Sequence, residues 1–321
     1  MKILVTGGRG TVGSVLARQL ISRGHAVVSC DLTHGTDEIG FSLRTDVEKP
    51  SYVRCDVGDS RQVARIFDVM GPFDVVYHLA AEFGRWNGED FYEQVWRTNA
   101  VGTKNVLRLQ EQHRFRLVHF SSSEVYGDWD DVMSEDVMEK HEIKQMNDYA
   151  LSKWVNECQI RNSMTQFKTE SVVVRLFNTY GPGEYYSPYR SVNCRFMYCG
   201  LMGLPWVVFR NYYRSSTYVE DTVRSLAAIA TNFKPGEVYN IGSNQYHSIE
   251  ELSDMVLKVT GADPGLVEYR DAEMLTTRIK KVDNTKAVRD LGHKDTVTLE
   301  EGVRRTVDWM RNVYGVSESR K

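Results

Sequence analysis

The sequence has few of the residues that mark secreted, membrane-bound or metal-stabilised proteins. Its 321 residues include only five cysteines, an odd number, without a Cys-x-x-Cys pair. A disulfide framework and a zinc site are therefore not expected, and reduced thiols are typical of the cytoplasm. No apolar run approaches the ~20 residues of a membrane span, and the few apolar residues before Gly7 are shorter than a signal-peptide core. We expect a cytoplasmic protein with no metal and no membrane partner.

An excess of charge of either sign is also missing. The 40 lysines and arginines nearly balance the 43 aspartates and glutamates, which gives a net charge of −3. A nucleic-acid partner is therefore not expected. The hydrophobic content of 41% with 26% charged residues is that of a packed chain and excludes a disordered one. The length predicts one large domain, or a larger domain with a smaller one.

Short β-branched runs alternate with amphipathic, helix-length segments in the first half of the chain. This alternation predicts an α/β fold with a doubly wound parallel sheet of the Rossmann type. The expected strands are Ile3–Thr6, Ala26–Cys30, Tyr52–Cys55, Val75–Leu79, Leu117–Phe120, Val172–Leu176 and Val238–Ile241.

From about Tyr180 to Tyr218 aromatic residues and arginines crowd together, which predicts the start of a smaller C-terminal lobe. We assign residues 1–179 and 217–240 to the Rossmann-type domain, and residues 180–216 and 241–321 to the lobe. A helix is expected over about 219–232. Two further helices are predicted by capping boxes, one at Ser248 with Glu251 and one at Thr298 with Glu301.

A glycine-rich loop, residues 7–13, joins the first predicted strand to the first helix. Its glycines permit a tight turn, a close approach of the backbone to a pyrophosphate, and close packing of helix on strand. Asp31 ends the second strand about 20 residues on, where a carboxylate accepts both ribose hydroxyls and repels a 2′-phosphate. The loop therefore predicts NAD rather than NADP, bound by Gly7, Gly10, Thr11, Val12, Gly13 and Asp31.

Further cofactor contacts are predicted where the third and fourth strands end. Asp56, followed by Val57, can accept a hydrogen bond from the adenine amino group, although a solvated turn residue is the alternative. Leu79, Ala80 and Ala81 close the fourth strand with small residues that let the backbone approach a cofactor, but plain strand packing explains them nearly as well.

Tyr149 and Lys153 are spaced i and i+4, on one face of a predicted helix. A lysine beside the phenol lowers its pKa from ~10 toward neutrality, so that the phenolate serves as a general base at a sugar hydroxyl. Ser122 follows the fifth strand at the ligand-binding edge of the sheet and can hydrogen-bond the same oxygen. An accidental surface pair and an ordinary polar loop are the alternatives.

Together with Asn99 and the run Arg175–Pro182, these motifs resemble the extended short-chain dehydrogenase/reductases that modify nucleotide sugars. Within that family the chain is most similar to the NAD-dependent C4 epimerases of UDP-glucuronate, those of antibiotic biosynthesis included. The resemblance implies a UDP-sugar substrate and a homodimer paired through two helices. It also implies that Tyr149, Lys153, Ser122 and Ser123 are catalytic.

The resemblance further implies that Asn99 supports the cofactor site. The loop over residues 209–213 departs from the glycine-rich loop of relatives, which puts nucleotide contacts there in doubt. The substrate-binding residues that the resemblance implies are Ser122, Ser123, Glu124, Asn178, Arg190, Asn193, Arg195, Arg214 and Arg278.

The expected reaction converts UDP-glucuronate to UDP-galacturonate, by oxidation to a 4-keto sugar and return of the hydride to the opposite face. A UDP-glucuronate decarboxylase is the strongest alternative, because such relatives also carry the Ser-Glu pair found at 123 and 124. A 4,6-dehydratase is a further alternative, but relatives of that kind have Asp where Ser123 stands. The remaining alternative is a non-catalytic NAD-binding protein.

Overall fold

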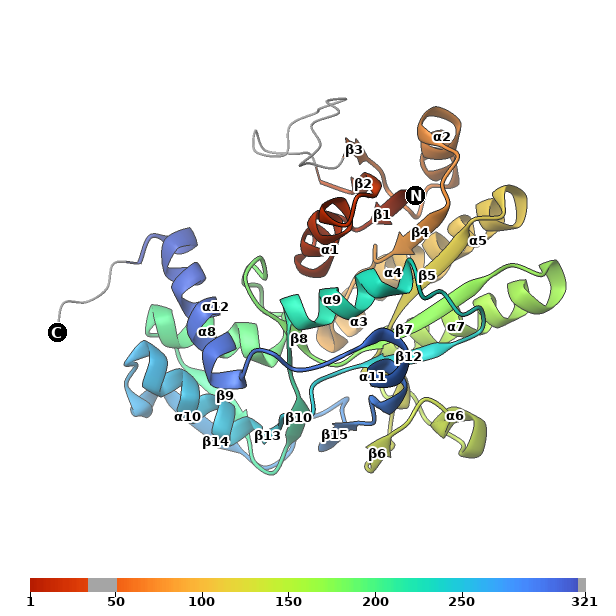
Figure 1. Cartoon of the computed structure of the whole chain (residues 1–321). Helices are drawn as coiled ribbons and strands as arrows, with labels where there is room; N and C mark the ends of the chain where they lie inside the picture. The colour runs from red at the N-terminus through yellow and green to blue at the C-terminus, as the bar shows by residue number, and fades with distance from the viewer. Residues whose placement is uncertain (34–50, 317–321) are drawn as a thin grey trace.

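The computed structural model describes residues 1–33 and 51–316. At its centre lies a seven-stranded parallel sheet with the strand order β12-β7-β5-β4-β1-β2-β3 (Figure 1). All seven strands expected from the sequence are confirmed, with small shifts at their ends. Their bounds are β1 Lys2–Thr6, β2 Ala26–Asp31, β3 Ser51–Arg54, β4 Val75–His78, β5 Arg116–Ser122, β7 Ser171–Leu176 and β12 Val238–Ile241.

Helices cover both faces of this sheet, as its buried strands require. Ile3 and Val5 face a core shared with α1 and α9, whereas Leu4 faces a core shared with α2, α5 and α7. The alternation of side chains along β1 thus fills both layers. The bounds of these helices are α1 Thr11–Ser22, α2 Ser60–Met70, α5 Gly102–His113, α7 Asp148–Phe167 and α9 Val219–Ile229.

The strand order reverses beside β1. The chain runs from β1 outward to β2 and β3, and then places β4, β5, β7 and β12 on the other side. In such sheets the crevice outside the carboxyl ends of the strands at the reversal is the usual ligand site. The fold therefore predicts a ligand site at the carboxyl ends of β1 and β4.

The segment before α5 is interrupted rather than one continuous helix. It contains α3 (Arg85–Asp90), α4 (Tyr92–Val95) and the π-helix η2 (Trp96–Val101), which leads directly into α5. Asn99 lies within η2, and such wide turns are frequent at functional sites.

The smaller lobe has its own core, formed mainly by α8, α10, α12 and the pair β9–β14. The capping box at Ser248 and Glu251 is confirmed. At the second expected box, Thr298 accepts from the Glu301 N–H, but the Glu301 carboxylate pairs with Arg304 and Arg305 instead. The bounds are α8 Val192–Met202, β9 Trp206–Phe209, α10 Ile249–Thr260, η4 Pro264–Leu266, β14 Val267–Arg270 and α12 Leu299–Tyr314.

Several short elements tie the lobe to the larger domain. A four-stranded sheet of order β13-β10-β15-β6 takes three strands from the lobe and β6 from the first half of the chain. Helix α11 packs its Ala287 and Leu291 into the core shared with α1 and α9. The bounds are η3 Ser123–Tyr126, β6 Val132–Met133, α6 Val137–Lys140, β8 Thr179–Tyr180, β10 Tyr213–Ser215, β11 Thr217–Tyr218, β13 Tyr246–Ser248, β15 Ile279–Val282 and α11 Thr285–Leu291.

The described part of the chain contains no helix with the length and apolarity needed to cross a membrane. Within residues 1–33 and 51–316, no cluster of three His, Cys, Asp or Glu side chains is placed to hold a metal ion.

Candidate active site

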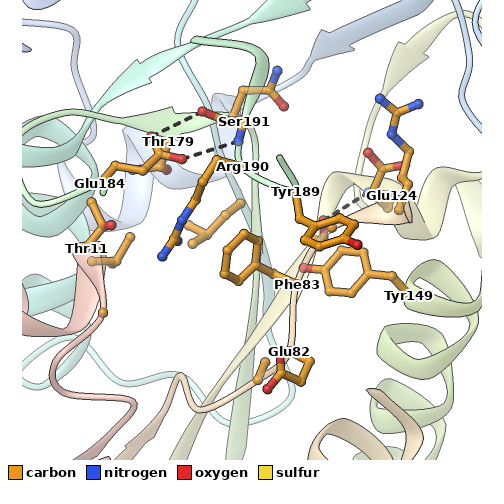
Figure 2. Close-up of a pocket in the computed structure, with 18 of the residues that line it drawn as sticks. Thr11, Glu82, Phe83, Glu124, Tyr149, Thr179, Glu184, Tyr189, Arg190 and Ser191 are labelled. Carbon is orange, nitrogen blue, oxygen red and sulfur yellow. Dashed lines mark hydrogen bonds between the residues drawn. The ribbon is translucent and has the colours of Figure 1, made fainter. Parts of the chain in front are cut away.

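A cavity of about 650 Å³ lies between the carboxyl edge of the large sheet and the smaller lobe. Figure 2 shows Glu184 and Arg190 on one side of it and Glu124 and Tyr149 on the other. Twenty of the residues singled out from the sequence line this cavity: Gly7, Gly10, Thr11, Val12, Gly13, Asp31, Asp56, Val57, Leu79, Ala80, Ala81, Ser122, Ser123, Glu124, Tyr149, Lys153, Asn178, Arg190, Arg195 and Arg214.

Three of the singled-out residues do not line it. Asn99 is buried behind the cavity, where its side chain bonds the backbone of Glu82 and the hydroxyl of Ser152. Asn193 is also buried, and its carbonyl oxygen accepts from Ser216 Oγ at 3.3 Å. Arg278 is exposed, its backbone carbonyl accepts from Arg214, and its guanidinium lies 5.9 Å from the centre of the Tyr212 ring, so its role in nucleotide binding stays a prediction.

The glycine-rich loop leaves space that side chains would close. A Cβ at Gly7, which has φ +69°, would lie 2.7 Å from the backbone nitrogen of Ala80. A Cβ at Gly13 would lie 2.2 Å from the carbonyl oxygen of Gly7. Helix α1 begins at Thr11 with no side-chain cap and no acidic residue in its first turn, so its positive end faces the cavity uncompensated. The cradle therefore fits the diphosphate of a dinucleotide.

Two carboxylates stand beside this cradle. Asp31 is held by the backbone N–H groups of Arg9 and Leu32, at 3.0 Å and 2.8 Å, which fixes its side chain at the end of β2. Asp56 accepts from the Gly58 N–H at 2.8 Å and pairs with Arg97 at 2.6 Å. The ribose contact at Asp31 and the adenine contact at Asp56 stay predictions, and both side chains are placed to make them.

Ser122, Tyr149 and Lys153 come together at the end of β5. The Asn147 side chain accepts from the Ala150 N–H at 2.8 Å and so fixes the start of α7, which carries the tyrosine and the lysine. Lys153 Nζ donates to the Phe120 carbonyl at 2.8 Å and lies 5.9 Å from the centre of the Tyr149 ring. Ser122 and Tyr149 are hydrogen-bonded through their side chains.

The expectation that Lys153 brings the pKa of Tyr149 toward neutrality is contradicted. Burial raises the pKa of Tyr149 to about 12, and only the hydrogen bond with Ser122 opposes this rise. The reason is that a buried phenolate loses its solvation, while the Lys153 ammonium is directed at the Phe120 carbonyl. Burial also lowers the pKa of Lys153 to about 8. The phenol is thus protonated here and needs further positive charge to become a base.

Lys280 was not predicted from any sequence motif. It lines the cavity from β15 and forms an ion pair with Glu124. The Lys280 side chain is 4% exposed and that of Glu124 is 18% exposed. Burial lowers the pKa of Lys280 to about 8. For Glu124, burial is outweighed by Lys280 and Arg85, and its pKa is lowered. The cavity thus holds a carboxylate and an ammonium beside Tyr149.

Arginines gather at the same end of the cavity. Arg85 pairs with Glu273 at 2.7 Å, and Arg214 lies 3.9 Å from the same carboxylate. Arg195 also lines the cavity, and its buried Nε has no hydrogen-bond partner among the described residues. The cluster contains two more cations than carboxylates: Arg85, Arg195, Arg214 and Lys280 against Glu124 and Glu273.

A protein-family model described as "NAD dependent epimerase/dehydratase family" matches residues 3–242. The chain therefore belongs to this family of NAD-dependent enzymes, which act on nucleotide sugars. The resemblance inferred from the sequence is confirmed, and so is NAD as the cofactor. The glycine-rich cradle and Asp31 are the residues that would hold NAD.

Relatives of the chain catalyse several reactions. dTDP-glucose 4,6-dehydratase 1 of Escherichia coli is 31% identical, over 96% of this chain and 92% of that protein. A UDP-N-acetyl-alpha-D-glucosaminuronate decarboxylase of Bacillus cytotoxicus is 28% identical, over 97% and 98%. The structure of UDP-glucuronic acid 4-epimerase from Bacillus cereus, in complex with UDP-glucuronic acid and NAD, is 25% identical with a TM-score of 0.83, over 98% and 100%.

Proposed function

We propose that this enzyme converts UDP-glucuronate to UDP-galacturonate by oxidising the sugar at C4 and returning the hydride to the opposite face. The observation that carries the proposal is the surplus of positive side chains in the cavity cluster, where Arg85, Arg195, Arg214 and Lys280 meet, among the described residues, only Glu124 and Glu273. A buried positive cluster stabilises anions. It suits a substrate that carries both a diphosphate and a sugar carboxylate.

Tyr149 is the group that would take the proton from the C4 hydroxyl. Its hydrogen-bond partner Ser122 would bind the same sugar oxygen and stabilise the charge that develops on it. Bound NAD would accept the hydride from C4 and give it back, and its positively charged oxidised ring would favour the Tyr149 phenolate. Lys153, with its ammonium on the same side of α7, would hold the ribose next to that ring.

The fate of the sugar carboxylate decides the net reaction. A 4-keto hexuronate is a β-keto acid, which loses carbon dioxide when the breaking bond aligns with the ketone. Cations around the carboxylate favour its charged ground state, whereas the charge disperses when carbon dioxide leaves. The surplus of cations therefore supports an epimerase that retains the carboxylate.

Decarboxylation is a second candidate because of the Glu124–Lys280 pair. After carbon dioxide leaves, the enolate must receive a proton at C5, and an ammonium with a pKa of about 8 is a suitable donor. A dehydratase is less well supported, because the family resemblance implies an aspartate beside the glutamate in dehydratases, and this chain has Ser123 there.

One assay separates these reactions. The enzyme with NAD is incubated with UDP-glucuronate in D₂O, and the nucleotide sugars are separated and weighed by mass spectrometry. Epimerisation gives UDP-galacturonate without solvent deuterium. UDP-xylose carrying one deuterium at C5 would instead assign decarboxylation and overturn the proposal.

We also propose that the enzyme is a homodimer, with residues 1–179 and 217–240 binding NAD and residues 180–216 and 241–321 binding the sugar nucleotide. Val101 on η2 and Leu151 on α7 are 49% and 38% exposed, and these two helices lie against each other. Apolar side chains exposed on adjacent helices support a second copy as their partner. Light scattering at micromolar concentration should give twice the chain mass, and a monomer mass would refute the dimer.

A further inference from the structure

Glu273 places a carboxylate in the middle of the arginine cluster. It lies in the loop between β14 and β15 and lines the cavity, and its side chain is 11% exposed. Its neighbours come from separate parts of the chain: Arg85 from α3 and Arg214 from β10. Arg195 of α8 also interacts with its charge. Three guanidinium groups thus share one carboxylate.

The loop is held in place without the help of this carboxylate. The Glu273 N–H donates to the Tyr212 hydroxyl at 2.8 Å. Arg85 donates to the Met274 carbonyl at 3.1 Å, and the Asn147 side chain donates to the Leu275 carbonyl at 3.1 Å. These contacts involve backbone atoms of the loop. Neutralising the Glu273 side chain therefore leaves the loop anchored.

Arg214 does not need Glu273 for its orientation either. One of its guanidinium nitrogens donates to the carbonyls of Tyr213 and Arg278, at 2.8 Å and 3.0 Å. The distance from Arg214 to the Glu273 carboxylate is 3.9 Å, longer than a hydrogen bond. What Glu273 contributes to Arg214 is therefore charge compensation rather than geometry.

We propose that Glu273 is an internal counter-anion, which neutralises part of the arginine cluster and competes with the diphosphate of the substrate for it. This inference rests on the proposed function in one respect, namely that the ligand of the cluster is the diphosphate of a sugar nucleotide. The carboxylate lowers affinity for any phosphate ligand, and it does so most for ligands with the greatest negative charge. Glu273 thereby sets the strength of nucleotide binding.

The competing explanation is that Glu273 orients Arg85 for binding, since their 2.7 Å contact is a direct hydrogen bond. The two explanations predict opposite results for Glu273→Gln. Glutamine keeps an oxygen that accepts from Arg85 but removes the negative charge. A counter-anion predicts tighter binding of phosphate ligands, whereas an orienting carboxylate predicts weaker binding, because charged hydrogen bonds are the stronger ones.

The test is calorimetric titration of UDP into the NAD-loaded enzyme, with pyrophosphate and uridine as further probes. Asp271→Asn is the matched control, because Asp271 lies in the same loop, pairs with Arg210 at 3.3 Å and is 87% exposed. We expect Glu273→Gln to bind UDP about tenfold more tightly at low salt, a factor that corresponds to ~1.4 kcal/mol. The gain should shrink in high salt and vanish for uridine. Asp271→Asn should match the wild type.

Unchanged or weaker UDP binding by folded Glu273→Gln would overturn the proposal. So would the absence of UDP and pyrophosphate binding from both proteins. The titration involves no turnover, so a product other than UDP-galacturonate would refute the proposed reaction while leaving the result on Glu273 intact.

Discussion

Lys280 and Glu124 form a buried ion pair that joins the smaller lobe to the end of β5, next to Tyr149. Lys280→Met should leave the Glu124 charge buried without its closest partner. Breaking such a pair costs about 3–5 kcal/mol, so we expect a loss of that order in the free energy of unfolding by urea.

The double variant Glu124→Gln/Lys280→Met should recover a large part of that loss, because no uncompensated charge remains. If Lys280→Met unfolds with wild-type stability, the pair is not a buried one in solution.

Tyr149→Phe should abolish turnover while leaving UDP-sugar binding nearly intact. The phenol oxygen is needed when the C4 proton leaves, and a positioned general base contributes about 10²–10⁴-fold in rate. Steady-state kinetics and titration of UDP measure the two quantities separately. Tyr189→Phe is the control, because Tyr189 also lines the cavity but its hydroxyl donates to Asp90 at 2.9 Å. A Tyr149→Phe variant with more than about a tenth of the wild-type kcat would show that another group is the base.

Arg195→Leu should raise KM for the nucleotide sugar more than it lowers kcat. Its guanidinium Nε is buried beside the cavity and has no hydrogen-bond partner within residues 1–33 and 51–316, which suits a group that binds the ligand in both ground and transition states. We expect KM to rise about tenfold or more, since charge-assisted hydrogen bonds contribute roughly 1.5–3 kcal/mol. An unchanged KM would remove Arg195 from the binding site.

The buried carboxyl group of Glu184 should make the free energy of unfolding depend on pH. Burial raises its pKa to about 6, against the opposing charge of Arg190. A raised carboxyl pKa means that its contribution to stability is complete below the unfolded pKa, near 4.5, and is lost as pH rises through about 6. Glu184→Gln should therefore differ from the wild type by less than about 0.5 kcal/mol at pH 4.5 and be more stable by about 2 kcal/mol at pH 8. Exposed Glu142→Gln is the control, and an equal difference at both pH values would refute the assignment.

The large domain follows from local sequence patterns, and the structure confirms it because its strands are buried, β-branched and separated by helix-length segments. Ser122 and the glycine loop are similarly placed by their position at strand ends, and Tyr149 by its helical spacing to Lys153. The strands of the lobe are harder to predict from the sequence, since strands of three residues, such as β10 and β13, are too short to show a periodicity.

Sequence patterns do not reveal Lys280, Arg85 and Glu273 as site residues, and the reason is the same for all three. Lys280 meets Glu124 across 156 positions of sequence, and Arg85 meets Glu273 across 188. Neither pair has a spacing that a helix or strand would produce, so only the packing of the lobe against the sheet reveals them. The raised pKa of Tyr149 is also hidden from the sequence, because the burial that causes it depends on the same packing.

The central claim is that the hydride leaves C4 and returns to C4 while the carboxylate stays on the sugar. UDP-glucuronate deuterated at C4 tests this claim most directly, with the product analysed by NMR. The account predicts UDP-galacturonate that retains the deuterium at C4, with no accumulation of NADH. A product that has lost its carboxylate, or deuterium released into free NADH, would contradict it.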